Sequence, residues 1–355
     1  MRAVYKSEPK LGLEFRDNAE EPTITNHDND VLIKVKRTGI CGTDLHIYTW
    51  DAWAQHRMSS KLPLIVGHEV VGTVVEVGKN ITTVREGDLV SAETHLACGK
   101  CYLCRTGRKA TCQNSVILGV DTTGVYADYA ILHEENAWIN DPKLPLEVAA
   151  VLEPLGNAFH TVLPEHNIED IVGKKVLVTG AGPIGLFTIA LCKQIGAEEV
   201  YTTEINPKRM DLAKKMGADR VINPLEENTH KEVMDLTNDI GVDVLLEISG
   251  HAQALKDGLR SLVPGGRVSL LGIYDKDVTL DLNDLMIFKG ARVFGIIGRR
   301  MFDTWYQLKG VLSRAEFQNK IRQVVTDVYP LENINEAMDN LLKGHSAKTI
   351  LKVND

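Results

Sequence analysis

Four cysteines stand close together in the chain with the spacing C-x2-C-x2-C-x7-C. They are Cys98, Cys101, Cys104 and Cys112. Four thiolates on one short loop can complete the tetrahedral coordination of a structural zinc ion. Disulfides or an iron–sulfur cluster could use the same residues, but six cysteines in 355 residues is not the density of a disulfide-rich secreted protein. The spacing therefore predicts a closed zinc site that stabilises a lobe and takes no part in chemistry.

A second group of potential metal ligands precedes this loop. Cys41 and the adjacent pair His68 and Glu69 offer a sulfur, a nitrogen and an oxygen. Three protein ligands are typical of a catalytic zinc ion, which keeps one coordination position open. Each residue alone could be structural, such as a cysteine beside a turn glycine or a histidine at a strand edge. Taken with the four-cysteine loop, the group favours a second zinc site, and it favours zinc over an iron–sulfur cluster.

A glycine-rich segment predicts a nucleotide site. Residues 180–185 read Gly-Ala-Gly-Pro-Ile-Gly and match G-x-G-x-x-G, between an expected strand at 176–179 and an expected helix at 184–195. Such a turn lets a pyrophosphate approach the backbone and the positive end of the helix. The predicted cofactor-binding residues of the turn are Gly180, Gly182, Ile184 and Gly185.

Glu204 ends the next expected strand, at 200–203. An acid at this place hydrogen-bonds the adenine ribose and repels a 2′-phosphate, which favours NAD over NADP. Arg209 follows in the next helix and could pair with a phosphate or stack on the adenine edge. We expect NAD, with both residues in its site.

The expected secondary structure divides the chain into two kinds of segment and predicts an α/β protein. The first half contains short β-branched runs at 31–36, 70–78 and 88–92, which indicate a barrel-like β domain. From about residue 174 strands alternate with helices, which predicts a doubly wound parallel sheet. Its further expected elements are a helix at 207–216 and strands at 242–248, 267–272 and 292–297, and the tail has helices at 305–312 and 334–342 and a strand at 349–353.

Composition narrows the class of function. Hydrophobic residues make up 44% and charged residues 25% of the chain, as in an ordinary globular enzyme. A net charge of −8 argues against a nucleic-acid partner. No apolar run approaches the roughly 20 residues that span a bilayer, and the first residues lack the apolar core of a signal peptide. We therefore expect a cytoplasmic protein with a small-molecule substrate.

The order of these motifs resembles that of the zinc-dependent medium-chain alcohol dehydrogenases along essentially the whole chain. Cys41 comes first, followed by Gly67-His68-Glu69, the cysteine lobe and the G-x-G-x-x-G turn. The resemblance implies a GroES-like β-rich catalytic domain and a Rossmann cofactor domain. We expect the catalytic domain at 1–157 with its zinc lobe at 93–115, the Rossmann domain at 158–298 and a return to the catalytic domain at 299–355. It also implies NAD, two zinc ions per subunit and a homotetramer.

Four separated segments narrow the resemblance to the branch of this family that oxidises L-threonine. They are residues 46–55, 93–95, 153–158 and 303–306. The branch often has Glu where this chain has Asp303, and some relatives have Asp in place of Glu153; neither change removes a carboxylate. The implied reaction converts the 3-hydroxyl to a ketone, giving 2-amino-3-oxobutanoate, and reduces NAD+. A polyol or 2,3-butanediol dehydrogenase of the same family is the alternative.

The same resemblance assigns roles to the remaining residues. Thr43 and His46 would relay the substrate proton, Glu153 would be a further zinc ligand or exchange with Glu69, and His95 would lie near the substrate. A non-enzymatic relative that binds nucleotide without turnover is a third reading, and the intact set of ligands and relay residues argues against it. The segments that match the surroundings of the nicotinamide are Leu271, Gly272, Ile273, Ile296 and Ile297.

Overall fold

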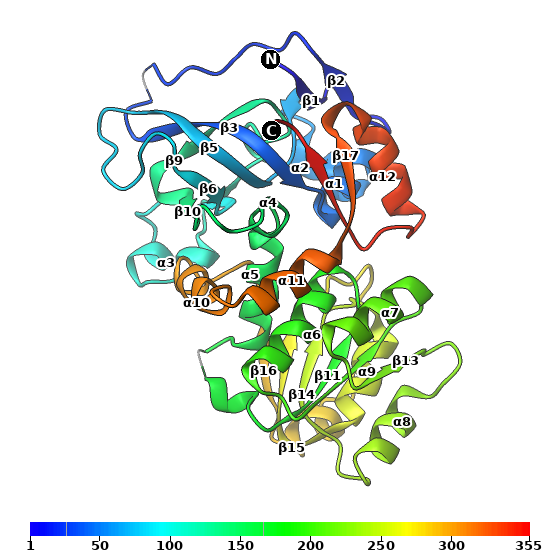
Figure 1. Ribbon diagram of the computed structural model, residues 1–355. Helices are drawn as coiled ribbons and strands as arrows, with labels where there is room; N and C mark the ends of the chain where they lie inside the picture. Colours follow the sequence, from blue (N-terminus) through cyan, green and yellow to red (C-terminus); the bar gives the residue numbers. More distant parts are fainter. Residues whose placement is uncertain (26, 166) are drawn as a thin grey trace. The chain divides into compact units, whose positions relative to one another are not determined.

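The computed structural model describes residues 1–25, 27–165 and 167–355, and the chain divides into two units (Figure 1). The first unit combines Met1–Glu153 with Val325–Asp355, and the second is the intervening Pro154–Val324. Among the helices of the described residues, none has both the length and the apolar character that crossing a bilayer requires.

The first unit is built mainly of antiparallel sheet. Its strands are β1 (Ala3–Lys6), β2 (Glu14–Arg16), β3 (Asp30–Gly39), β4 (Leu64–Ile65), β5 (Glu69–Val77), β6 (Leu89–Ala92), β7 (His95–Leu96), β8 (Val116–Ile117), β9 (Tyr129–His133), β10 (Ala137–Ile139), β17 (Val325–Pro330) and β18 (Lys348–Lys352). Its helical segments are α1 (Gly42–Thr49), α2 (Ala52–Met58), α3 (Tyr102–Arg105), η1 (Lys109–Thr111), η2 (Glu134–Asn136), α4 (Leu146–Ala149), η5 (Leu331–Asn333) and α12 (Ile334–Leu342). The large sheet has the order β10-β6-β5-β3-β18-β17, and β9 also pairs with β3.

Strand β3 lies at the centre of this sheet, and its register decides which distant residues meet. Val31, Ile33 and Val35 are fully buried and Lys34 is exposed, so one face of the strand packs into the core. At its end, Gly39 pairs with Glu69 of β5 on one side. On the other side Gly39 pairs with Ile350 of β18. Chain segments from three parts of the sequence therefore converge where β3 ends.

The second unit is a six-stranded parallel sheet with the order β13-β12-β11-β14-β15-β16. If β11 is counted as the first strand, this is the 3-2-1-4-5-6 order of the Rossmann fold. The strands are β11 (Lys175–Thr179), β12 (Glu199–Thr203), β13 (Arg220–Ile222), β14 (Val242–Glu247), β15 (Leu262–Leu270) and β16 (Arg292–Gly295). The helical segments are α5 (Leu152–Val162), which begins at the boundary, η3 (Ile168–Asp170), α6 (Pro183–Ile195), α7 (Pro207–Met216), α8 (Thr229–Leu236), α9 (Ala252–Arg260), η4 (Asn283–Ile287), α10 (Asp303–Val311) and α11 (Ala315–Val324).

The expected fold class is confirmed, but the second crossing between units comes later than expected. We expected the chain to return to the catalytic domain at residue 299, whereas the first unit resumes at Val325. Helix α11 packs against α6 and α7 of the second unit. The amphipathic pattern of a helix shows that one face is buried, but it does not show against which domain.

Candidate active site and zinc lobe

The four cysteines of the lobe come together as the spacing predicted. Their Sγ atoms all lie within 4.8 Å of one another. Cys101 precedes α3, and its Sγ lies 3.5 Å from that of Cys104 and 3.9 Å from that of Cys112. Zinc–sulfur bonds of about 2.3 Å give a tetrahedron with edges of about 3.8 Å, so the sulfurs fit a zinc ion. All six cysteines are free in the structure, which favours the zinc site over the disulfide alternative.

Hydrogen bonds in the lobe stabilise negative sulfur. Cys112 Sγ accepts from the backbone N–H groups of Cys98 at 3.3 Å and Asn114 at 3.4 Å. Hydrogen bonding to the backbone at Lys100 lowers the pKa of Cys98 to about 6. A thiolate is the form of cysteine that binds metal.

The second predicted cluster also forms. One donor atom each from Cys41, His68 and Glu69 lies within 4.8 Å of the others. Cys41 follows the end of β3, and the pairing of Gly39 with Glu69 sets it beside the start of β5. A Cβ on Gly39 would lie 1.9 Å from Glu69 Oε2, so a side chain there would displace the carboxylate.

Two buried atoms of this cluster lack a hydrogen-bond partner among the described residues, Glu69 Oε2 and His68 Nδ1. Unpartnered buried polar atoms are costly, and each one needs an explanation. His68 Nδ1 lies 3.5 Å from Asp44 Oδ1, an ion-pair contact too long for a normal hydrogen bond. That contact orients the ring and leaves Nε2 for a metal ion. The sulfur, nitrogen and oxygen donors with an open carboxylate oxygen fit a catalytic zinc ion.

Asp44 was not singled out from the sequence, although it lies in the Cys41–His46 segment. Its carboxylate accepts from the Cys41 backbone N–H at 2.8 Å and lies 2.8 Å from the Tyr126 hydroxyl. Burial raises the pKa of Asp44, but the facing His68 and the hydrogen bonds from the Cys41 N–H and the Tyr126 hydroxyl together lower it further, so the net shift is downward. An ionised Asp44 thus contacts both the backbone of Cys41 and the imidazole of His68, two of the predicted ligands.

Lys348 is the second residue that the sequence did not indicate. It lies at the start of β18, is 2% exposed, and donates from Nζ to Glu69 Oε1 and to the Ile40 carbonyl, each at 2.7 Å. Burial lowers the pKa of Lys348, but the charge and hydrogen bond of Glu69, together with the nearby Cys41 and Glu153, raise it more, so the net shift is upward. Burial raises the pKa of Glu69, Lys348 opposes this, and Glu153 adds to it. Glu153 therefore lies near enough to act electrostatically on the cluster.

The predicted relay residues share helix α1. Thr43 and His46 are three residues apart, so they lie on one face of the helix. His46 is exposed, and its Nδ1 lies 2.5 Å from Asp51 Oδ2. His95 lies on β7 with Nδ1 3.4 Å from Glu93 Oε1.

The glycine turn of the second unit has the shape that a dinucleotide needs. Gly180 has φ +84°, and a Cβ on Gly185 would lie 2.0 Å from the Gly180 carbonyl oxygen, so neither position tolerates a side chain. A Cβ on Gly182 would meet no atom within 4 Å. The backbone is therefore open to a ligand at Gly182, where α6 begins.

Glu204 follows β12 and is held rigidly. Its Oε1 accepts from the backbone N–H groups of Ile205 and Asn206, both at 2.9 Å, and its Oε2 accepts from Ala181 at 3.1 Å. Arg209 NH1 lies 3.8 Å from Glu204 Oε2. The structure thus brings the predicted acid to the glycine turn, together with the arginine.

Glu247, at the end of β14, is a further residue that sequence reasoning missed. Its backbone carbonyl accepts from Leu271 and Gly272, at 2.9 and 3.1 Å. Its buried carboxylate accepts from the Tyr274 hydroxyl at 2.7 Å and from the Gly250 backbone N–H at 3.0 Å. Glu247 therefore ties together the loops after β14 and β15, which contain three of the predicted cofactor residues. Ile296 N donates to Leu270 O at 2.9 Å, while Ile273 and Ile297 are exposed.

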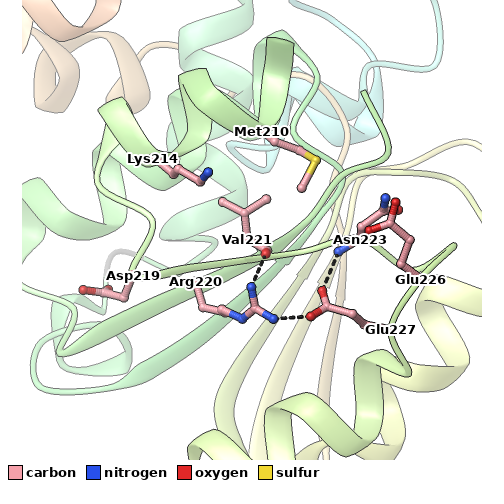
Figure 2. A pocket seen from close by; sticks show the side chains of 8 residues that line it. All are labelled: Met210, Lys214, Asp219, Arg220, Val221, Asn223, Glu226 and Glu227. Atoms are coloured by element: carbon pink, nitrogen blue, oxygen red, sulfur yellow. Dashed lines mark hydrogen bonds and ion pairs between the residues drawn. The ribbon is translucent and has the colours of Figure 1, made fainter. Parts of the chain in front are cut away.

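A cavity of about 430 Å³ lies elsewhere in the second unit, between α7 and β13 (Figure 2). None of the predicted cofactor residues lines it. Arg220 donates to the Val221 carbonyl at 3.1 Å and to the Glu227 carboxylate. Since this arginine is satisfied by the protein, the cavity offers no ligand a free positive charge from Arg220.

Comparison with known proteins gives the same assignment for both units. Residues 27–142 match the alcohol dehydrogenase GroES-like domain, and residues 183–314 match the zinc-binding dehydrogenase domain. The L-threonine 3-dehydrogenase of Caldanaerobacter subterraneus subsp. tengcongensis is 46% identical, and that of Pyrococcus horikoshii is 47% identical. Each match covers 99% of this chain and 98% of the relative. The 2R,3R-butanediol dehydrogenase structure from Bacillus subtilis is 27% identical, with a TM-score of 0.85 over 99% of both chains.

Proposed function

The chain belongs to the zinc-binding alcohol dehydrogenases, and from that premise we propose that it oxidises L-threonine to 2-amino-3-oxobutanoate with reduction of NAD+. The observation that carries the proposal is the cluster of Cys41, His68 and Glu69, with its open carboxylate oxygen, next to the relay helix α1. It lies in a chain that is 46–47% identical to L-threonine 3-dehydrogenases over nearly its whole length.

The residues of the cluster hold and orient the reacting groups. A zinc ion bound by Cys41, His68 and Glu69 supplies a Lewis acid, and NAD+ supplies the hydride acceptor. Thr43 accepts the proton of the substrate hydroxyl and passes its own proton to His46, whose exposed ring delivers it to solvent. Glu153 acts on the cluster through its charge, either as an additional ligand or by exchange with Glu69.

The four-cysteine lobe holds a second zinc ion in each subunit. Its four thiol groups leave no open coordination position, so the lobe has a structural role only. The two sites differ in their donor sets, which supports two zinc ions of different lability in each chain.

Glu204 supports NAD over NADP as the cofactor. Three backbone N–H groups and Arg209 hold its carboxylate at the glycine turn. A carboxylate fixed there accepts hydrogen bonds from the ribose diol and repels a 2′-phosphate. Leu271, Gly272, Ile273, Ile296 and Ile297 complete the nicotinamide half of the site.

The proposal also covers assembly and location: the protein forms a homotetramer in the cytoplasm. Ile287 and Phe288 expose 65% and 76% of their surface, and Val293 on the edge strand β16 exposes 40%. Large apolar side chains near an unpaired strand edge are typical of a surface that another subunit covers.

A substrate panel tests the proposed reaction. L-Threonine presents a carboxylate and an ammonium group, and burying either one unpaired is costly, so a site built for it rejects neutral diols. We expect kcat/KM for L-threonine to exceed that for 2,3-butanediol by roughly 10⁴-fold, with D-threonine and sorbitol also poor. His95→Ala should reduce threonine turnover and leave NAD affinity nearly unchanged. Comparable efficiency on 2,3-butanediol and L-threonine would replace the proposal with the diol alternative.

A further inference from the structure

The segment that follows α1 doubles back on His46 by means of an unusual backbone conformation. Trp50 ends α1 in the left-handed region, with φ 57° and ψ 49°, which is uncommon for a bulky residue. The turn holds Trp50 in place, since it is 7% exposed, has Lys6 Nζ 5.0 Å above its ring, and offers its carbonyl to Gln55 at 2.9 Å. Strained backbone that the surroundings maintain often has a functional cause.

The result of this turn is that Asp51 reaches two partners at once. Its Oδ1 accepts from the Ala54 backbone N–H at 3.0 Å and caps α2. Its Oδ2 lies 2.5 Å from His46 Nδ1. The centroid of the Trp53 ring lies 6.0 Å from that of the imidazole, and the two ring planes are tilted by 54°. The exposed His46 ring is therefore held in one orientation.

An ionised carboxylate can only accept hydrogen bonds, so the short contact requires the proton to be on His46 Nδ1. In the neutral ring the lone pair is then on Nε2. We propose that Asp51 is a positioning residue that fixes this tautomer, so that Nε2 is the nitrogen that accepts the substrate proton from Thr43. The proton on Nδ1 stays on the ring, hydrogen-bonded to Asp51, while Nε2 gains one and later releases it to solvent. This inference rests on the proposed relay through His46.

Two substitutions separate the tautomer from the helix cap. Asn and Ser are both good N-cap residues, so Asp51→Asn and Asp51→Ser should each preserve α2. In Asp51→Asn the amide oxygen caps Ala54 and the NH2 group faces His46 Nδ1, which favours a proton on Nε2 and blocks the relay. We expect kcat to fall by about 100-fold or more in Asp51→Asn, and by about tenfold or less in Asp51→Ser, which leaves both tautomers available.

The decisive measurement is a double-mutant cycle on kcat with His46→Ala, with zinc content and NAD affinity measured in every variant. Asp51→Asn should have no further effect once the His46 side chain is removed, because it acts only through that ring. Asp30→Asn is a matched control, since Asp30 Oδ2 lies 2.7 Å from His27 Nδ1 in a similar exposed pair outside the site. It should leave kcat unchanged.

The outcomes distinguish the two proposals. If His46→Ala retains the wild-type kcat, the relay itself is wrong. If kcat falls in His46→Ala but not in Asp51→Asn, the inference about Asp51 is overturned and the relay stands. The same conclusion follows if Asp51→Asn lowers kcat by the same factor with and without the His46 side chain.

Discussion

Glu69 of the first unit and Glu247 of the second are both completely buried, yet their oxygens have opposite surroundings. Glu69 Oε1 accepts from Lys348, and Glu69 Oε2 has no partner among the described residues. Glu247 Oε1 accepts from Ser249 Oγ at 2.6 Å and from the Gly250 N–H, and its Oε2 accepts from Tyr274. The buried carboxylate of Glu69 therefore keeps one oxygen without a hydrogen bond, whereas both oxygens of Glu247 accept hydrogen bonds.

The difference separates Glu69, which we propose as a zinc ligand, from Glu247, which holds two loops together. A glycine stands against each carboxylate: a Cβ on Gly39 would lie 1.9 Å from Glu69 Oε2, and one on Gly272 would lie 2.6 Å from Glu247 Oε2. Close packing by glycine is therefore common to both and does not indicate function. What distinguishes them is the charge of the partners and whether an oxygen is left for a metal ion.

Removing the cation beside Glu69 should give the largest effect. Lys348→Met leaves a buried carboxylate without its compensating charge, which costs about 3–5 kcal/mol. We expect the free energy of unfolding to fall by that amount and the catalytic zinc to be lost, as measured by denaturant titration and metal analysis. Lys352→Met is the control, because Lys352 lies on the same strand with its side chain 47% exposed; it should cost about 0–1 kcal/mol. A stable Lys348→Met protein with full zinc content would contradict the assignment.

A neutral isostere at Glu247 should have a smaller effect of a different kind. In Glu247→Gln one accepting oxygen becomes an NH2 group that meets the donors it previously bound, which costs about 1–3 kcal/mol. Zinc content should not change. NAD should bind more weakly, because Glu247 fixes the loop that contains Leu271 and Gly272. Isothermal titration with NAD measures this.

Tyr274→Phe provides the graded comparison for Glu247→Gln. It removes only one hydrogen bond, so the free energy of unfolding should fall by about 1 kcal/mol. If Glu247→Gln released zinc or left NAD affinity at the wild-type value, Glu247 would not be the scaffold described.

The same contrast explains how much the sequence could predict. The four cysteines and the glycine turn lie within short stretches, so their spacing alone indicated their chemistry. Glu69 could be predicted because it stands beside His68 and completes a set of donor types with Cys41. Lys348 had no signal at all, since it lies 279 residues away and meets Glu69 only through the β3–β5 and β3–β18 registers. Register between distant strands depends on the whole sheet.

Glu247 was not predicted from the sequence for a related reason. Glu247 lies at a strand end, and its role depends on donors from the loop after β14 and from the loop after β15, including Tyr274. The parallel sheet itself could be predicted, because buried apolar strands alternated with helices. The residue at which the chain returns to the first unit could not be predicted, because it depends on the helices against which α11 packs.

The smallest expected effect concerns Asp121. This carboxylate is intermediate between Glu69 and Glu247, because its partners include both cations and a backbone N–H group. Its side chain is 11% exposed, and it pairs with Arg57 at 2.6 Å and with Lys61 while accepting from Ile117 N at 3.0 Å. Burial raises the pKa of Asp121, but Lys61, the Ile117 N–H and Arg57 together lower it further, so the net shift is downward. Both cations are partly exposed, so solvent screens the pair, and we expect Asp121→Asn to cost about 1 kcal/mol at pH 7.

The pH dependence of this cost identifies its source. A carboxylate whose pKa is lower in the folded state stabilises the protein above the unfolded pKa of about 3.9 and loses that contribution as the pH falls through the folded value. The difference in unfolding free energy between wild type and Asp121→Asn should therefore be constant from pH 7 to about pH 5 and shrink below that. Urea titrations of both proteins between pH 7 and about pH 2 measure it, because most of the contribution is lost between the unfolded and the folded pKa, and any acid release of zinc from the wild type should affect the variant equally. A difference that stayed constant to the lowest pH would mean that Asp121 acts through its hydrogen-bond geometry and not through its charge, which would place it with Glu247 as a scaffold residue.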